Sequence, residues 1–546
     1  MSSAFSRRRA LIAVAGVAVT ALALVGCATK SSGGTSTSGA AADTLTVGTT
    51  DTVTFLDPAG SYDNGSFAVM NQVYPFLFNS ALGTPDVSPD IAVSGDFTTP
   101  TTFTVKLKPG LKFANGDDLT SSDVKFSIDR QLKIADPNGP SYLLGNVASV
   151  AAPDDTTVVF TLKVANDQTL EQVLSGPAGP IVDEQVFSPT AVTPDADIVK
   201  ADAFAGQYTI SDYKLNSLVT FKAYDGYQGL LGPAKTKTVT LKYYTDPANL
   251  KLDVQQGNID VAYRSLSATD VDSLRKDSNV NVVDGPGGEI RYIVFNFDTM
   301  PYGTKTSDAD AAKALAVREA AADLVDRQAL ATNVYKDTYT PLYSFVPDGL
   351  TGATTVLKDL YGDGSGAPSL DKAKQVLADA GVSTPIDLKL QYVQDGHYGP
   401  SSADEYAAIK DQLEQGGLFT VDLQSTEYTT YSKERTQDAY PAYQLGWFPD
   451  YSDADNYLTP FFPQGGFLGN HYDNPDVDKL ITEQVGETDA AKRTADIQQI
   501  QELVAKDLST LPLLQGSQVA ITGKDISGAT LDGSFKFRYG SLVKQG

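Results

Sequence analysis

The spacing of apolar residues constrains the fold of this chain more than any other feature, and it changes part-way along the sequence. In the first half, apolar and polar residues alternate over short segments such as TFTVKLK (102–108), TTVVFTLK (156–163) and KTVTLKYY (237–244). Alternation of this kind is typical of strands with one buried face, and turn residues such as Pro109-Gly110 separate the segments. The first half therefore predicts a sheet-dominated region with short helices between the strands.

The second half, from about Arg291, predicts longer helices. RYIVFNF begins at that residue and is apolar without alternation, which indicates a strand buried on both faces. We expect a long alanine-rich helix at about 308–334. A second helix is expected over SLDKAKQVLADAG (369–381), where Gly381 suits the left-handed position that ends many helices.

The rest of this half predicts strands that alternate with helices. A strand is expected at 386–392, then a helix opened by a capping box of Ser402 and Glu405, then a strand at 418–425. An extended segment is expected at 511–523, where the chain returns to the body of the protein. Such alternation predicts an α/β region, with a parallel or mixed sheet flanked by helices.

The N-terminus predicts export from the cytoplasm. Arginines at 7–9 precede an apolar run at 10–26, which is the layout of a secretory signal peptide (1–26). The run ends in Leu-Val-Gly-Cys, which resembles the lipobox of bacterial lipoproteins, so we expect lipidation at Cys27, the only cysteine in the chain. The Ser/Gly/Thr-rich segment that follows predicts a lipid-anchored flexible tether over 27–43. An uncleaved anchor with an incidental cysteine remains the alternative, and the general secretory and twin-arginine export routes both stay open.

The net charge bears on the partner. A formal charge of −25 at pH 7 argues against nucleic acid, because phosphate binding requires clustered basic residues. The charge suits cationic or zwitterionic ligands, and it is equally compatible with solvation alone. No second long apolar run follows the signal, so we expect a soluble body.

The sequence offers no clear catalytic or metal site. His397 and His471 are the only histidines, and neither lies in a nucleophile motif. Two histidines and one cysteine make a zinc or nickel site improbable. Pairs of carboxylates could still serve a glycosidase, but no local pattern selects one. We therefore expect no enzyme activity, no metal and no cofactor.

One loop, LGWFPDYSDADNY (445–457), concentrates unusual residues. It holds the only tryptophan, Trp447, together with Asp450, Asp453 and Asp455. The spacing of these carboxylates does not fit a calcium-binding loop, which requires glycine at position 6 and glutamate at position 12. A carboxylate among aromatic rings suits capture of an ammonium group. From composition alone, a structural role as core and turn caps is slightly favoured.

Several stretches, taken in order, resemble a known family. FTVKLKPGLKFANGDDLTSSDVKFSIDR (103–130) is similar to the most diagnostic segment of the extracellular solute-binding proteins of family 5, which serve peptide and nickel ABC transporters. ALAVREAAADLVDRQAL (314–330) resembles another characteristic segment of that family. NFDTMPY, PLYSFVPDG, SLDKAKQVLADAG, YDNPDVDKLI and the terminal LPLL match further ones. The resemblance covers about residues 45–544.

This resemblance implies a fold and its division into parts. It implies an α/β two-lobed periplasmic-binding-protein-like clamp of the class II type, with three subdomains and with mixed sheets flanked by helices. Lobe I would comprise 44–290 and 510–546, with an inserted subdomain at about 75–200. Lobe II would comprise 291–509.

It also implies a function. The chain would be a substrate-binding lipoprotein of an ABC importer, monomeric and lipid-anchored on the extracytoplasmic face of the membrane. It would capture peptides, expected to be short oligopeptides, and deliver them to permease subunits. Alternatives are the same clamp binding an oligosaccharide, an opine or a metal chelate, and, in another class, a secreted lipoprotein hydrolase.

The site residues implied by the resemblance lie in the tryptophan loop. They are Gly446, Trp447, Asp450 and Tyr451, which match a Gly-Trp-x-x-Asp-Tyr stretch of peptide-binding members. Asp450 would pair with the α-ammonium of the ligand, and the two aromatic residues would wall it.

The remaining charges near this loop have other expected roles. Asp453 and Asp455 are expected to be structural. No arginine can be assigned to a ligand carboxylate, because Arg435 is a neighbour in sequence only.

Overall fold

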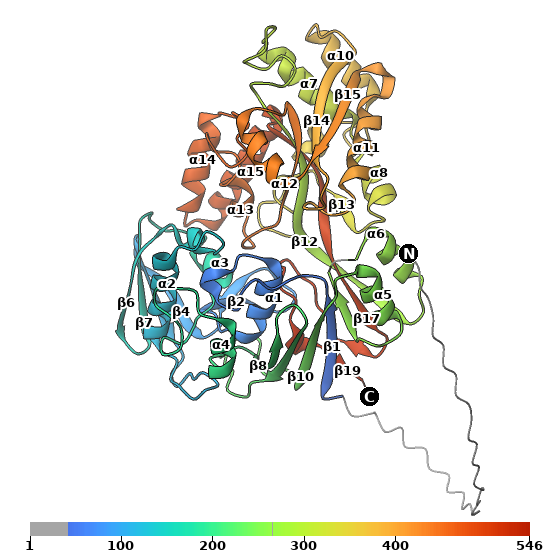
Figure 1. Ribbon diagram of the computed structural model, residues 1–546. Coiled ribbons are helices and arrows are strands. Elements are labelled where there is room, and N and C mark those ends of the chain that lie inside the picture. The colour runs from blue at the N-terminus through green and yellow to red at the C-terminus, as the bar shows by residue number, and fades with distance from the viewer. Residues whose placement is uncertain (1–41, 265, 546) are drawn as a thin grey trace, which may run out of the picture. The chain divides into compact units, whose positions relative to one another are not determined.

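The computed structural model describes residues 42–264 and 266–545 (Figure 1). The predicted signal peptide, the lipidation site at Cys27 and nearly all of the tether lie outside the described residues. Within the described part, no helix combines the length and the apolar character needed to cross a membrane.

The largest sheet has 11 strands, and its order is β15-β14-β16-β12-β17-β11-β1-β10-β9-β8, with β13 paired to β17. Its strands, in that order, are Phe419–Thr426, Ile386–Val393, Ala442–Trp447, Val280–Phe295, Thr510–Gly523, Val261–Tyr263, Thr44–Thr49, Thr238–Tyr243, Leu218–Ala223 and Tyr208–Lys214, with β13 at Tyr339–Pro341. Parallel and antiparallel pairs both occur, so the sheet is mixed, as predicted.

Two long strands run through both halves of this sheet. β12 and β17 pair antiparallel from Val280↔Gly523 to Val294↔Thr510, with the register broken between Pro286 and Ile290. β17 pairs with β11 near the end of its own length, over residues 520–522, and β12 pairs with β16 over residues 290–295. Figure 1 shows β12 reaching into the upper part of the molecule and β17 reaching into the lower part. The chain therefore leaves the first half of the molecule along β12 and returns along β17.

A second sheet of four antiparallel strands is built from the early part of the chain. Its order is β4-β5-β7-β6, over Ala92–Thr99, Thr102–Leu107, Thr157–Leu162 and Val147–Asp154. The alternation predicted at 102–108 and 156–163 is confirmed, because Phe103, Val105 and Phe160 are buried. Two small sheets pair β2 (Phe78–Ser80) with β3 (Val87–Pro89), and β18 (Ile526–Ser527) with β19 (Val543–Lys544).

The helices flank these sheets. In the first half they are α1 (Asn64–Val73), α2 (Ser121–Ile134), α3 (Leu170–Ser175), α4 (Asp195–Ala201), α5 (Pro247–Gln255) and α6 (Ala268–Arg275). In the second half they are α7 (Ala311–Leu324), α8 (Arg327–Ala329), α9 (Val356–Leu360), α10 (Leu370–Asp379), α11 (Ser402–Leu413), α12 (Tyr428–Glu434), α13 (Asp455–Leu458), α14 (Pro475–Val485) and α15 (Ala490–Asp507).

Two helix predictions were wrong in detail. The helix expected over 308–334 ends at Leu324, because Val325 is extended and the Asp326 side chain caps a new short helix by accepting from Ala329 N. The capping box of Ser402 and Glu405 does not form, since α11 has no side-chain cap. The predicted left-handed Gly381 is confirmed, with φ of 66°.

The buried apolar residues form three large clusters. The N-terminal core runs from Leu45 to Leu542 in sequence, the inserted core from Leu77 to Ala205, and the C-terminal core from Ile290 to Leu514. A buried ion pair of Asp57 and Arg130, 2.7 Å apart, fixes α2 near the N-terminal core. The lobe boundaries at 290/291 and 509/510 and the inserted subdomain at 75–200 stay predictions, and these clusters support them.

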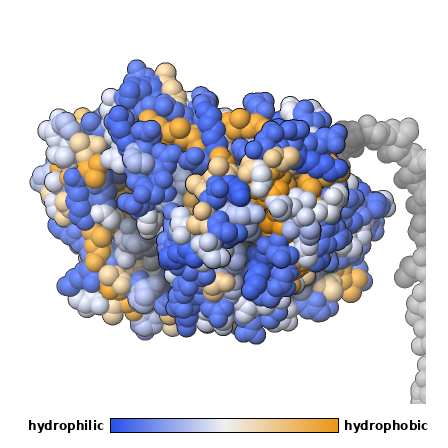
Figure 2. Space-filling view, turned by 90° about the horizontal axis from the view of Figure 1, so that it is seen from above, coloured by the Kyte–Doolittle hydropathy of each residue, from blue (hydrophilic) through white to orange (hydrophobic). Residues whose placement is uncertain are grey.

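The surface reflects the acidic composition. Figure 2 shows one face, seen from above Figure 1, that is largely hydrophilic with small separate apolar patches. Single exposed apolar residues are ordinary on a protein surface. The aromatic residues that bear on function lie instead around a cavity.

Candidate functional site

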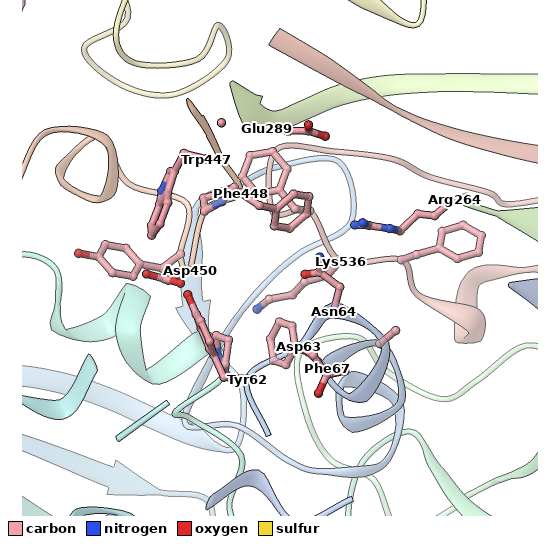
Figure 3. Close-up of a pocket in the computed structure, with 18 of the residues that line it drawn as sticks. Tyr62, Asp63, Asn64, Phe67, Arg264, Glu289, Trp447, Phe448, Asp450 and Lys536 are labelled. Carbon is pink, nitrogen blue, oxygen red and sulfur yellow. The ribbon is translucent and has the colours of Figure 1, made fainter. Parts of the chain in front are cut away.

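A cavity of about 710 Å³ collects side chains from distant parts of the chain (Figure 3). Its walls come from α1 and the residues before it, from the ends of β11 and β16, and from loops at 396–400 and 446–452. A C-terminal segment at 534–537 completes the lining. Its size suits a small-molecule or short-peptide ligand, since such pockets measure roughly 300–1,000 Å³.

The tryptophan loop enters the wall because β16 ends there. Gly446 and Trp447 are the last residues of β16, and they pair with Arg291 and Ile290 of β12. A Cβ at Gly446 would lie 3.0 Å from the ring of Tyr398, so only a small residue fits without displacing that ring. All four residues predicted for the site, Gly446, Trp447, Asp450 and Tyr451, line the cavity. Their roles in ligand binding stay predictions.

Asn456 positions this loop, and we did not predict it. Its Oδ1 accepts from the Trp447 indole Nε1 at 3.1 Å and from the Asp450 backbone N at 2.8 Å. Its Nδ2 donates to Asp450 Oδ2 at 3.2 Å. One buried amide therefore fixes both the ring and the carboxylate. The signal was available, because Asn456 lies within the 445–457 segment and is the only asparagine there.

Asp450 is buried at the cavity wall with half of its carboxylate unpaired. Asp450 is 8% exposed, and its Oδ1 has no hydrogen-bond partner among the described residues. Burial raises the pKa of Asp450 to about 6, and the hydrogen bond from Asn456 lowers it in part. A carboxylate in this state lacks a cation or donor, and a ligand ammonium can supply both.

The two aromatic residues of the loop have different surroundings. The Trp447 ring meets Phe461 edge-on, with centroids 5.0 Å apart, and also lies near Phe467. The Tyr451 ring packs against the inserted core, and its hydroxyl donates to Asp455 Oδ2 at 2.9 Å. The loop therefore contacts residues of the first half of the molecule through Tyr451 and residues of the second half through Trp447.

Asp453 and Asp455 are engaged within the protein. Asp453 accepts from both terminal nitrogens of Arg493, at 2.7 and 2.9 Å. Asp455 accepts from Tyr451 and also from Thr459 and Gln484. These contacts are those of structural residues.

Three basic residues line the cavity, none of which the sequence singled out. Arg264 pairs with Asp51 at 3.2 Å, and Arg291 pairs with Glu289 at 2.9 Å. Lys536 is buried beside them. Arg435 does not line the cavity. Its guanidinium donates to the carbonyl oxygens of residues 467 and 468 and lies over the Phe467 ring, so it supports the aromatic wall from behind.

Comparison with known proteins now identifies the family. The family described as bacterial extracellular solute-binding proteins, family 5 Middle, matches residues 86–468. The chain belongs to this family. The resemblance to the family 5 solute-binding proteins, predicted from the sequence, is therefore confirmed.

Relatives and solved structures extend this result over the described chain. The probable D,D-dipeptide-binding periplasmic protein DdpA of Escherichia coli is 26% identical over 501 residues, covering 89% of this chain and 91% of that protein. The dipeptide-binding protein DppE of Bacillus subtilis is 25% identical, covering 93% and 94%. The structure of HbpA2 from Haemophilus parasuis matches with a TM-score of 0.78 at 20% identity, covering 92% and 100%. The predicted two-lobed α/β clamp with mixed sheets flanked by helices is confirmed.

The two histidines of this solute-binding protein occupy different places. His397 lines the cavity and stacks on Tyr428, with centroids 3.4 Å apart, and burial lowers its pKa. His471 lies away from the cavity lining, in a cluster with Asp298 and Asp438. The Lys305 ammonium already contacts both carboxylates of that cluster, at 2.8 and 2.9 Å. The cluster is thus a salt-bridge network with its own cation.

Proposed function

We propose that this protein captures short oligopeptides outside the cytoplasm and delivers them to the permease of an ABC importer. Asp450 receives the α-ammonium of the peptide in this proposal. The observation that carries it is the unpaired, buried Oδ1 of Asp450 at the wall of a peptide-sized cavity.

The chemistry of the wall fits an ammonium better than a neutral group. A buried carboxylate without a partner is costly, and an ammonium returns both charge balance and hydrogen bonds. Trp447 lies beside the carboxylate and offers a ring face for cation–π contact. Exposed Phe467 and the rings of Tyr62 and Phe448 give apolar surface for varied side chains.

The relatives support the same ligand class. DdpA and DppE are named for dipeptide binding. A dipeptide-binding protein of Pseudoalteromonas, solved with Met-Leu, shares the fold with a TM-score of 0.70 at 18% identity. An oligosaccharide has less support, because a neutral sugar brings no cation to the unpaired carboxylate at the cavity wall. An opine carries an amine and a chelate carries a metal ion, so these two alternatives are separated from peptides by the binding experiment and not by this carboxylate.

Capture would proceed by closure of the two lobes. The cavity is lined from both halves of the chain, so a ligand that contacts both favours the closed arrangement. The division of the lobes at 290/291 and 509/510 belongs to this proposal. So do the signal peptide, lipidation of Cys27, the tether that would keep the monomeric body near its permease, and the absence of catalysis.

Calorimetry with purified protein tests the proposal. Ligand-stripped protein should bind di- to pentapeptides with a free N-terminus, and N-acetylation or Asp450→Ala should weaken binding by about tenfold to a hundredfold. Asp453→Ala serves as the matched control in the same loop. Equal affinity of the wild-type protein for free and acetylated peptides would contradict the proposed role of Asp450.

A further inference from the structure

Lys536 is a buried cation without a carboxylate partner. Lys536 is 6% exposed, and its Nζ donates to Asn79 Oδ1 at 3.1 Å and to the Ser175 carbonyl oxygen at 2.6 Å. An ammonium has three donors, and these contacts use two of them. Within residues 42–264 and 266–545, no Asp or Glu oxygen lies within 4.0 Å of this Nζ.

Arg538 makes the shortage of negative charge more severe. Its Nη2 donates to the same Asn79 Oδ1, at 2.7 Å, and its Nη1 has no partner among the described residues. A neutral amide oxygen therefore serves two buried cations. The acids that act on them at longer range, Asp90 and Asp532, are held by other donors.

The other cavity cations differ in this respect. Arg264 has Asp51 as a carboxylate partner, and Arg291 has Glu289. Buried charges in proteins are normally paired. Lys536 alone among these three cavity-lining cations has no such partner within the described residues, so it is the one that a ligand anion would satisfy.

Lys536 and Asp450 belong to opposite sides of the clamp. Phe537, the residue after Lys536, lies in the N-terminal core, and Ala454, close to Asp450, lies in the C-terminal core. Figure 3 shows both side chains at the same cavity, with Lys536 extending toward the side on which Asp450 is drawn. The two sides meet nearby, since a Cβ at Gly176, next to Ser175, would lie 2.9 Å from the Asp450 carbonyl oxygen.

We infer that the ligand is a zwitterion whose acid group is received by Lys536 while its ammonium is received by Asp450. The anion would be a carboxylate, from the peptide C-terminus or from an acidic side chain. Such a ligand joins the two cores through its two charges, so that both are needed for tight closure. This inference rests on the proposed peptide ligand and adds the requirement for a second, negative charge.

The pKa of Lys536 reflects the lack of a carboxylate beside it within the described chain. Burial lowers the pKa of the Lys536 ammonium well below its usual range, and the charge of Arg538 lowers it further. A bound carboxylate opposes both effects. Binding above neutral pH is therefore expected to draw a proton to Lys536.

Peptides that differ only at the acid group test the inference. Trialanine should bind the wild type about tenfold to a hundredfold more tightly than trialanine amide. The ratio should fall to about one in Lys536→Met and should persist in Arg264→Gln, which removes a paired cavity cation. Alanyl-glutamyl-alanine amide separates the two sources of carboxylate, because recovered affinity assigns the site to acidic side chains as well as C-termini. Each ratio is taken within one protein, so a partly folded preparation does not alter it.

A second measurement separates this inference from the proposed function. At constant ionic strength, acetate in place of chloride should raise the melting temperature of the wild type more than that of Lys536→Met. If no peptide binds but this difference persists, the peptide function fails and the anion site stands. Equal affinity of the wild type for the acid and the amide, preserved discrimination in Lys536→Met, or an identical acetate response in both proteins overturns the inference.

Discussion

Replacing Asp450 by Asn should stabilise the ligand-free protein at neutral pH while it weakens peptide binding. The carboxylate is 8% exposed, and its pKa is raised to about 6 from an ordinary value of 3.8. Holding it ionised in the fold therefore costs free energy, at about 1.36 kcal/mol for each pH unit of difference. The cost at pH 7 is on the order of 3 kcal/mol. An amide of similar shape carries no such cost and can keep the contact with Asn456.

The sign of the effect depends on pH. Because the folded-state pKa of Asp450 is raised, its contribution to stability is fully present below about pH 4 and is lost as the pH rises through about 6. The gain from Asp450→Asn should accordingly be near zero at pH 4. It should grow between pH 4 and 6 and level off near pH 7.

Urea denaturation followed by far-UV circular dichroism measures this gain. Both proteins must first be stripped of ligand by unfolding and refolding, because bound peptide stabilises the wild type. Asp453→Asn is the control, and it should lower stability by about 1–3 kcal/mol, because it breaks a bidentate contact with Arg493. A loss of stability in Asp450→Asn at pH 7, or a gain that persists undiminished at pH 4, would refute the reasoning.

Four further outcomes are expected. Peptide affinity should fall about tenfold per unit as the pH drops below about 6, because Asp450 must be ionised to pair with an ammonium; calorimetry across pH 4.5–7.5 checks this, and a flat profile contradicts it. Asn456→Ala should cost about 1–3 kcal/mol of stability and weaken peptide binding, since it leaves the loop unsupported; wild-type affinity in a folded variant would count against its positioning role. Gly176→Val should weaken binding by about tenfold or more with little change in the melting temperature, because its side chain collides with the opposite wall on closure; calorimetry and small-angle scattering decide, and unaltered closure tells against the contact. Arg130→Met should destabilise the protein by about 3–5 kcal/mol by leaving Asp57 buried and unpaired, as measured by denaturation; a loss below about 1 kcal/mol would show that water reaches the pair.

Local patterns predicted the elements of the fold well where local forces decide them. The alternating runs at 102–108 and 156–163 became strands, because each has one face against a core. The helix expected over 308–334 failed for a local reason, the break at Val325 and Asp326, whereas the capping box failed where a distant residue intervened. Glu405 does not cap α11, and its carboxylate instead faces Arg291, 3.7 Å away on β12. Such pairing joins residues more than a hundred positions apart, and no local spacing encodes it.

The site was predictable only in part for the same reason. The tryptophan loop is continuous in sequence, so Trp447, Asp450 and Tyr451 could be grouped. Asn456 could have been added, because it is the polar amide of the same loop. The opposite wall is assembled from α1, β11 and the C-terminal segment, which meet only in the fold. Lys536 therefore carried no sequence signal beyond its charge.

How much an unpaired charge says about a ligand depends on how many partners of opposite charge the chain offers. With 67 acidic and 42 basic residues, many carboxylates in this protein must lack a basic partner, and on the surface this means little. A lysine is in the opposite position, because acidic partners are abundant. Among the described residues, the buried Lys536 ammonium donates hydrogen bonds to an amide oxygen and a carbonyl oxygen and lies over the Phe76 ring, with no carboxylate beside it, so it is the more informative of the two charges. Its lack of a partner cannot be attributed to composition, and it points to an anion that arrives with the ligand.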